Sequence, residues 1–175
     1  MGMFKIKAEG LEWADGSADN PQDLCLHGHV TVQFGDTVLQ DYGTVSATAL
    51  YLLKSLTEDS IMSERTIQMI PCCGFTMIAN ENLTKVDICG CINGTDWSTV
   101  HEGDRVRFIL PSGQQEVVSI REYRDEVLDF ADTVKVFYDF CTPKQMPNDD
   151  FDRNGYIAFW NEWHRRYEEE KRLSR

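Results

Sequence analysis

The sequence predicts an α+β fold in which one mid-chain helix and two C-terminal amphipathic helices pack on an antiparallel sheet of about six to eight strands. Two observations predict this class. Apolar and polar residues alternate along several short segments between residues 3 and 120, which is typical of half-buried strands, whereas apolar residues recur every three or four positions from residue 121 onward. Because no repeat or linker interrupts the chain, we expect residues 1–175 to form a single globular domain.

The N-terminal third is predicted to contain three strands and a helix. Residues 3–8 and 24–34 alternate, and residues 37–42 return through a two-residue turn that suits a twisted hairpin. Residues 44–59 then place apolar side chains three and four positions apart, with a hydroxyl residue available at the start as the N-cap. We therefore expect a short amphipathic helix after the first hairpin.

The middle of the chain is predicted to form two more hairpins. Residues 66–79 pair with residues 85–92, and residues 104–110 pair with residues 116–120 across a Pro-Ser-Gly-Gln turn. The strands therefore precede the last two helices instead of alternating with them, which favours antiparallel pairing.

Two helices are predicted after residue 121. Residues 122–141 carry an apolar stripe with acidic residues opposite, and two prolines in residues 142–148 end this helix. The last helix carries aromatic side chains on one face and charged i,i+4 pairs on the other. The aromatic residues are Tyr156, Phe159, Trp160, Trp163 and Tyr167, and the pairs are Glu162–Arg166, Arg165–Glu169 and Arg166–Glu170.

The charge of the chain restricts the classes of partner. Its 29 acidic residues outnumber its 17 Lys and Arg residues, which gives a net charge of −12. We expect no nucleic-acid partner, because binding phosphates requires clustered Lys and Arg, and a basic protein fits this charge better. No stretch of about 18 apolar residues is present, so we expect no membrane association, a cytoplasmic location and reduced cysteines.

The segment DDFDRNGY, residues 149–156, has the spacing of the start of a calcium-binding loop. Asp150, Asp152 and Asn154 would supply oxygen ligands from alternate positions, followed by a glycine at the sixth position. The glutamate that completes such a loop is missing, because its position is occupied by Asn161. The same residues also fit a second interpretation, namely the start of a helix that is capped by an aspartate. We favour the capped helix, with a calcium site as the alternative.

Three cysteines form a candidate zinc site in the 66–92 hairpin. If Ala79 lies opposite Thr84, the three cysteines share one face and their sulfurs could hold zinc together with a histidine. The candidate ligands are Cys72, Cys89 and Cys91, with His101 or His29 as the fourth. Their spacing differs from the Cys-x2-Cys pattern of strong zinc sites, so we favour buried structural cysteines over metal ligands.

His27 and His29 are a second candidate metal site. Two residues apart on a strand, their rings project from the same face. The opposite face, which includes Val30 and Val32, is predicted to lie in the core. Because no third ligand can be identified, the alternative is that both histidines simply occupy the polar face of the sheet.

No signature of catalysis is present: the chain has neither a Gly-x-Ser-x-Gly elbow nor a glycine-rich phosphate loop. The turn-rich segment NGTDWSTVHEG is predicted as a contact loop, with Asp96 and Trp97 available to a partner.

The segments DLCLHGHV, TVSATALYLL, PCCG, NGTDWS and FDRNGYIAFWNEWHRR together resemble small acidic bacterial proteins with no assigned function. The resemblance covers most of the chain and implies no residue roles. In size, acidity and fold class alone, the chain is also similar to immunity proteins, which are compact acidic α+β proteins that neutralise a toxin by binding it. We therefore expect a non-catalytic protein-binding or regulatory module without a cofactor. The alternative is a metal-binding protein or a small enzyme of unknown reaction.

Overall fold

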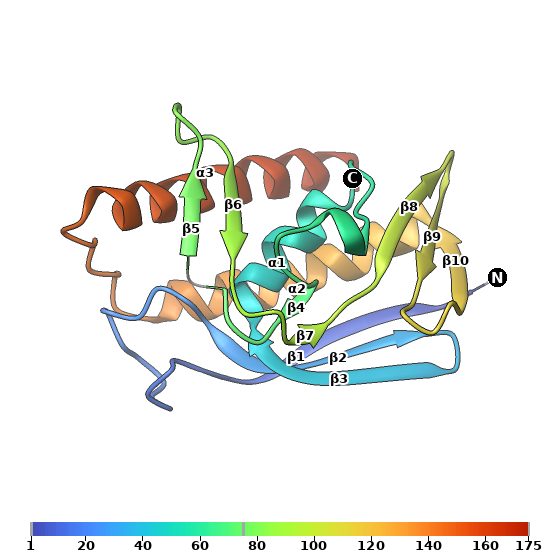
Figure 1. Ribbon diagram of the computed structural model, residues 1–175, viewed down its shortest axis with the longest axis horizontal. Helices are drawn as coiled ribbons and strands as arrows, with labels where there is room; N and C mark the ends of the chain where they lie inside the picture. Colours follow the sequence, from blue (N-terminus) through green and yellow to red (C-terminus); the bar gives the residue numbers. More distant parts are fainter. Residues whose placement is uncertain (1, 75, 175) are drawn as a thin grey trace.

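The computed structural model describes residues 2–74 and 76–174 and confirms the α+β class. Helix α1 (Val45–Lys54) lies at the centre of the molecule, and both α2 (Ile120–Phe140) and α3 (Asp150–Leu173) pack against it (Figure 1). A short 3-10 helix, η1, spans Met62–Glu64. In the described part of the chain, no helix is both long enough and apolar enough to span a membrane.

The strands are divided among four small antiparallel sheets that surround α1, instead of forming one sheet of six to eight strands. The first sheet has the order β1 (Phe4–Glu12), β2 (His27–Phe34), β3 (Thr37–Thr44), and another has the order β10 (Gln115–Ser119), β9 (Arg105–Ile109), β8 (Ser98–Glu102). The two-stranded sheets are β4 (Ile70–Pro71) with β7 (Gly94–Thr95), and β5 (Thr76–Ala79) with β6 (Val86–Cys89). In Figure 1 the β1–β2–β3 sheet lies below α1, and α3 lies above it.

Helix α1 is buried on all sides. The prediction that this helix is amphipathic is therefore wrong. Each of its residues from Val45 to Leu53 is buried. Its polar side chains are paired internally, because Ser46 Oγ accepts the N–H of Leu26 at 3.2 Å and Thr48 Oγ1 donates to the carbonyl of Thr44 at 3.1 Å. A central helix can therefore carry hydroxyl residues without leaving them unpaired.

The two short sheets on either side of the cysteine-rich segment are parts of one interrupted hairpin. Ile70 pairs with Thr95 in one ladder and Ala79 pairs with Val86 in the other, so both ladders keep the same register. Residues 72–74 and 90–93, between the two ladders, belong to neither of them. The cysteine-rich residues therefore lie in a break of the ladder and not in a regular sheet.

The register of this hairpin differs by two residues from the prediction. Ala79 lies opposite Val86 and not opposite Thr84. The reason is local: the side-chain oxygen of Asn80 accepts the N–H groups of Thr84 at 2.8 Å and Lys85 at 3.0 Å. These bonds assign Thr84 and Lys85 to the turn, so the strand begins later than alternation predicts.

Candidate functional site

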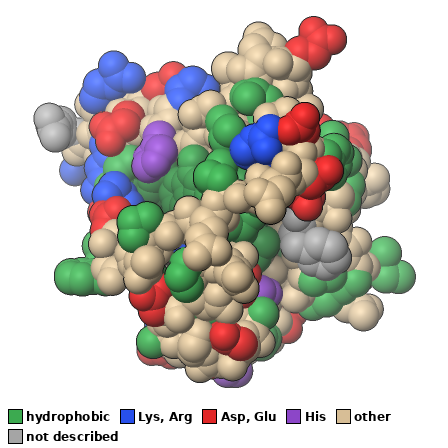
Figure 2. Space-filling model, turned by 90° about the vertical axis from the view of Figure 1, so that its left-hand side faces the viewer, with side chains coloured by type: hydrophobic (Ala, Val, Ile, Leu, Met, Phe, Trp, Pro, Cys, Tyr) green, Lys and Arg blue, Asp and Glu red, His purple; other side chains and the backbone are tan. Residues whose placement is uncertain are grey.

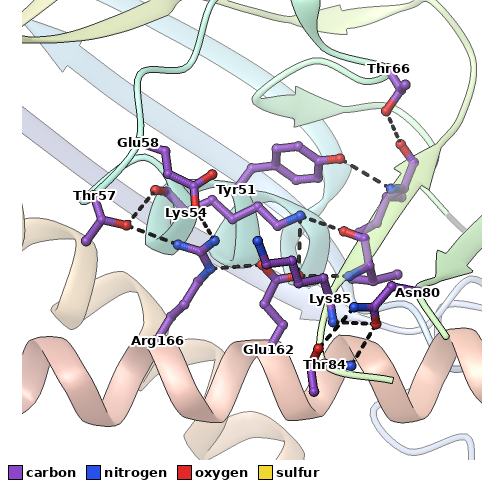
Figure 3. Close-up of polar contacts among 12 residues, drawn as sticks. Tyr51, Lys54, Thr57, Glu58, Thr66, Asn80, Thr84, Lys85, Glu162 and Arg166 are labelled. Atoms are coloured by element: carbon purple, nitrogen blue, oxygen red, sulfur yellow. Dashed lines mark hydrogen bonds and ion pairs between the residues drawn. The ribbon is translucent and has the colours of Figure 1, made fainter. Parts of the chain in front are cut away.

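A cleft opens where the C-terminal end of α1, residues 57–66, β6 and α3 meet (Figure 3). It consists of two adjoining hollows of about 360 and 310 Å³, which share Lys54, Glu58 and Asp87. We call the two hollows together the polar cleft. Its other charged lining residues are Asp59, Glu64, Arg65, Lys85, Glu162 and Arg166.

A buried carboxylate lies at the base of the polar cleft. Glu162 is fully buried, and its Oε1 accepts a hydrogen bond from Nε of Arg166 at 2.9 Å. Its Oε2 lies 3.4 Å from Nζ of Lys54. Arg166, which is also buried, forms a second ion pair with Glu58 and donates to Oγ1 of Thr57 at 3.1 Å. The buried charge is thus compensated by two cations and by hydrogen bonds, as a charge without access to water requires.

Side chains also bond the main-chain groups on the outer edge of β6, and Glu162 and Lys54 are two of them. The N–H and C=O groups of Val86 and Ile88 point away from β5, and each is bonded to a side chain instead of to another strand (Figure 3). The partners are Glu162 Oε2 at 2.8 Å and Lys54 Nζ at 2.5 Å for Val86, and Tyr51 Oη at 3.2 Å and Thr66 Oγ1 at 2.8 Å for Ile88. Every hydrogen-bonding group of this buried edge is therefore satisfied.

Three of the cations that line the polar cleft are held by internal contacts. Lys54 and Arg166 are engaged by Glu162 as described above. Arg65 forms an ion pair with Asp96 and donates to the carbonyl of Trp97 at 2.9 Å. These groups are therefore occupied in stabilising the walls of the cleft.

Two carboxylates of the polar cleft stay outside the ion pairs described above. Glu64 and Asp87 are exposed and have no ion-pair partner among residues 2–74 and 76–174. At Glu58 burial opposes ionisation, but the hydrogen bond and the charge of Arg166 hold the pKa of this carboxyl below its ordinary value. Lys85 is an exposed cation on the same lining and can balance only one of Glu64 and Asp87. At neutral pH the five carboxylates that line the cleft outnumber its four cations, so it presents a small net negative charge to solvent.

Two of the three charged pairs predicted on α3 are formed, but the face that carries them is partly buried. Glu162, Arg166 and Glu170 are buried, and Glu170 pairs with Arg124 at 2.7 Å instead of with Arg166. The reason is that α3 contacts the β5–β6 hairpin and α1 as well as α2. An i,i+4 spacing predicts that two charged side chains meet but not whether they are exposed. Nothing in the sequence around Lys54 indicates that it pairs with Glu162.

The structure brings together a different set of cysteines from the one predicted. The sulfurs of Cys72, Cys73 and Cys91 all lie within 4.8 Å of one another, whereas Cys89 stays outside this group. Cys72 and Cys91 are joined by a disulfide, so the expectation of reduced cysteines does not hold for this pair. Burial raises the pKa of Cys25 to about 12, which keeps it a neutral thiol.

The histidines proposed as metal ligands have other contacts. The rings of His27 and His29 lie against Tyr42, with centroid distances of 6.3 and 5.1 Å. His101 Nδ1 lies 3.0 Å from Oδ1 of Asp59, and its Nε2 lies 3.2 Å from a main-chain carbonyl oxygen. In the described ranges, no histidine belongs to a cluster of three or more potential ligands.

The calcium-like segment is the capped N-terminus of α3. The helix begins at Asp150, and the carboxylate of Asp149 accepts the N–H groups of Phe151 at 2.9 Å and Asp152 at 3.1 Å. Asp150, Asp152 and Asn154 therefore lie in the first turns of a regular helix and not in a ligand loop, as the capped-helix interpretation predicted.

The glycine of this segment has a packing role. At Gly155 a Cβ atom would lie only 2.2 Å from the carbonyl oxygen of Met77 in β5. A side chain at this position would separate α3 from the β5–β6 hairpin. The requirement for glycine therefore comes from close helix–strand packing, and not from the sharp turn of a calcium loop.

We expect calcium at about 1 mM to leave the melting temperature unchanged, because an ion stabilises a protein only by binding its folded state. The measurement is thermal unfolding with calcium, with magnesium at the same concentration as the control for ionic strength. A rise that calcium alone produces would contradict the capped-helix assignment.

The centre of the predicted contact loop lies in the interior. Trp97 is fully buried and cannot meet a partner. Asp96 accepts the N–H groups of Met69 and Trp97, both at 3.0 Å, and pairs with Arg65, while burial raises its pKa. The segment that follows forms β8 instead of a loop, so Asp96 and Trp97 anchor a strand.

A further hollow lies at the end of the molecule where α2 connects to α3. It has a volume of about 270 Å³ and is lined by aromatic residues of both helices, among them Tyr138 and Trp160. Figure 2 shows this end, where hydrophobic side chains are exposed among basic and acidic ones. Because the charges are mixed, this face lacks the single sign of charge that would select a class of partner.

Comparisons with protein-family models, with curated proteins and with solved structures return no match to this chain.

Proposed function

We propose that the protein is a non-catalytic cytoplasmic binding module whose polar cleft receives a basic side chain of a protein partner. The observation that carries this proposal is the charge of the cleft. In the part of the chain that the structure describes, Glu64 and Asp87 have no ion-pair partner, and the exposed Lys85 can balance only one of them. The other three cations of the cleft, Lys54, Arg65 and Arg166, are held by internal ion pairs. An incoming arginine or lysine would supply the missing positive charge.

The size and support of the cleft agree with this role. The hollow that contains Glu64 and Asp87 measures about 360 Å³, near the lower end of the range for ligand pockets, which suits one side chain of a partner. The buried bonds of Glu162 fix the wall of the adjoining hollow of the polar cleft, so little ordering is required there on binding. The net charge of −12 would speed association with a basic protein. Binding a basic toxin, as an immunity protein does, is one form of this function.

The double variant Glu64→Gln/Asp87→Asn should weaken binding of an oligoarginine peptide about tenfold, because two favourable charge contacts are lost. Fluorescence anisotropy of the labelled peptide measures the affinity. Wild-type binding should also weaken when salt is raised from low ionic strength to about 0.5 M, where exposed charges are screened.

The matched control is Asp104→Asn/Asp125→Asn, which removes the same total charge from exposed positions outside the polar cleft. This control should keep most of the affinity. An equal loss of peptide affinity in the two double variants would show that only the net charge matters and that the cleft is not the binding site. If the wild type did not bind the peptide at low salt, the proposal would also be overturned.

A further inference from the structure

The break in the β4–β7/β5–β6 hairpin holds three sulfurs close together. Cys72 and Cys73 lie on one side of the break and Cys91 on the other. All three are half-buried, and their sulfurs lie within 4.8 Å of one another. Across the ranges 2–74 and 76–174 this is the only group of three or more His, Cys, Asp or Glu residues with such spacing. We call it the cysteine triad.

The main chain holds the cysteine triad in place. The N–H of Cys72 donates to the carbonyl of Asn93 at 3.2 Å, which continues the hairpin register into the break. At Gly90 a Cβ atom would lie 1.9 Å from the carbonyl oxygen of Cys73, so only glycine allows the strands to approach here. The N–H of Cys91 donates to Sγ of Cys73 at 3.0 Å. This bond fixes the sulfur of Cys73 beside Cys91.

We infer that the cysteine triad, once reduced, is a binding site for a thiophilic d10 cation, Cu(I) or Zn(II). Three sulfur ligands at about 2.3 Å from an ion lie about 4 Å from one another. Once the bond between Cys72 and Cys91 is cleaved, the three sulfurs are close enough together to reach that spacing. The set contains only sulfur, and soft thiolate ligands select these ions over calcium or magnesium. This inference does not depend on the proposed binding of a basic protein.

The metal site and the disulfide exclude each other. A dithiol or phosphine reductant cleaves the S–S bond between Cys72 and Cys91, and two electrons and two protons convert it to two thiols. The three thiols then bind the ion and release three protons to solvent. The oxidised protein keeps only Cys73 as a free ligand of the triad, so it should not bind the ion.

The test uses the full chain, reduced with a phosphine and freed of metal under anaerobic conditions. Separate titrations with Cu(I) and with Zn(II), each against a chromogenic chelator, measure affinity and stoichiometry and distinguish the two ions. We expect about one equivalent of at least one of them per chain. We expect Cys73→Ser to lower the affinity about 100-fold or more.

The matched control is Cys89→Ser, because Cys89 lies in the same hairpin but outside the triad. This variant should bind like the wild type. A second readout uses the wild type, in which no substitution can impair folding. The bound ion should protect Cys72, Cys73 and Cys91 from alkylation, and mass spectrometry identifies which cysteines are alkylated. Equal loss in Cys89→Ser and Cys73→Ser, protection of other cysteines, or no binding by the reduced wild type would overturn the inference.

Discussion

Glu162→Ala should lower the free energy of unfolding by about 3–5 kcal/mol, because it leaves buried cations without their counter-charge. Arg166 is buried and Lys54 is nearly so, and both form ion pairs with the removed carboxylate. The N–H of Val86 would also lose its acceptor in a buried position. Urea unfolding followed by circular dichroism measures the change.

The control for this prediction is Glu169→Ala on the same helix. Glu169 pairs with Arg165 at 3.2 Å, but both side chains are exposed, so the loss should stay within about 0.5 kcal/mol. A loss below about 1 kcal/mol in Glu162→Ala would mean that the remaining groups are solvated, contrary to the burial in the structure.

Gly155→Ala should lower the free energy of unfolding by about 2–3 kcal/mol, although alanine favours a helix by about 1 kcal/mol relative to glycine. The added methyl group would overlap the carbonyl oxygen of Met77, at 2.2 Å, and its Cβ, at 2.8 Å. A main-chain carbonyl cannot rotate away as a side chain can, so α3 would have to move off β5.

Asn154→Ala is the matched control for Gly155→Ala. It changes the preceding residue of the same helix to alanine without adding an atom at the contact with Met77. Its stability should remain within about 0.7 kcal/mol of the wild type, in keeping with helix propensity alone. If both variants kept full stability in the same urea experiment, the close packing of α3 on β5 would be refuted.

Periodicity in the sequence was sufficient to predict the fold class and most of the elements. The alternation around His27 and His29 identified β2. The aromatic spacing and the pair Asp149–Asp150 identified α3 and a cap at one of these two aspartates, and the structure shows that it is Asp149. Both depend on local properties, namely the period of the backbone and the first turn of a helix. Such properties are encoded within a few neighbouring residues.

The polar cleft could not be predicted in the same way. Lys54 and Glu162 are more than a hundred residues apart, and their pairing depends on how α1 and α3 pack. The cysteine triad was only partly predictable, because hydrogen bonds of the Asn80 side chain shift the hairpin by two residues. Cys73 then joins Cys72 and Cys91 in place of Cys89.

The side-chain closure of β6 also bears on aggregation. An unpaired strand edge is a template on which another molecule can add a strand, the first step toward amyloid-like stacking. On β6 the main-chain groups of Val86 and Ile88 are already bonded, two of them to Glu162 and Lys54. A neighbouring molecule would first have to displace a buried carboxylate and an ammonium group, so this short hairpin resists intermolecular β-pairing without a covering strand.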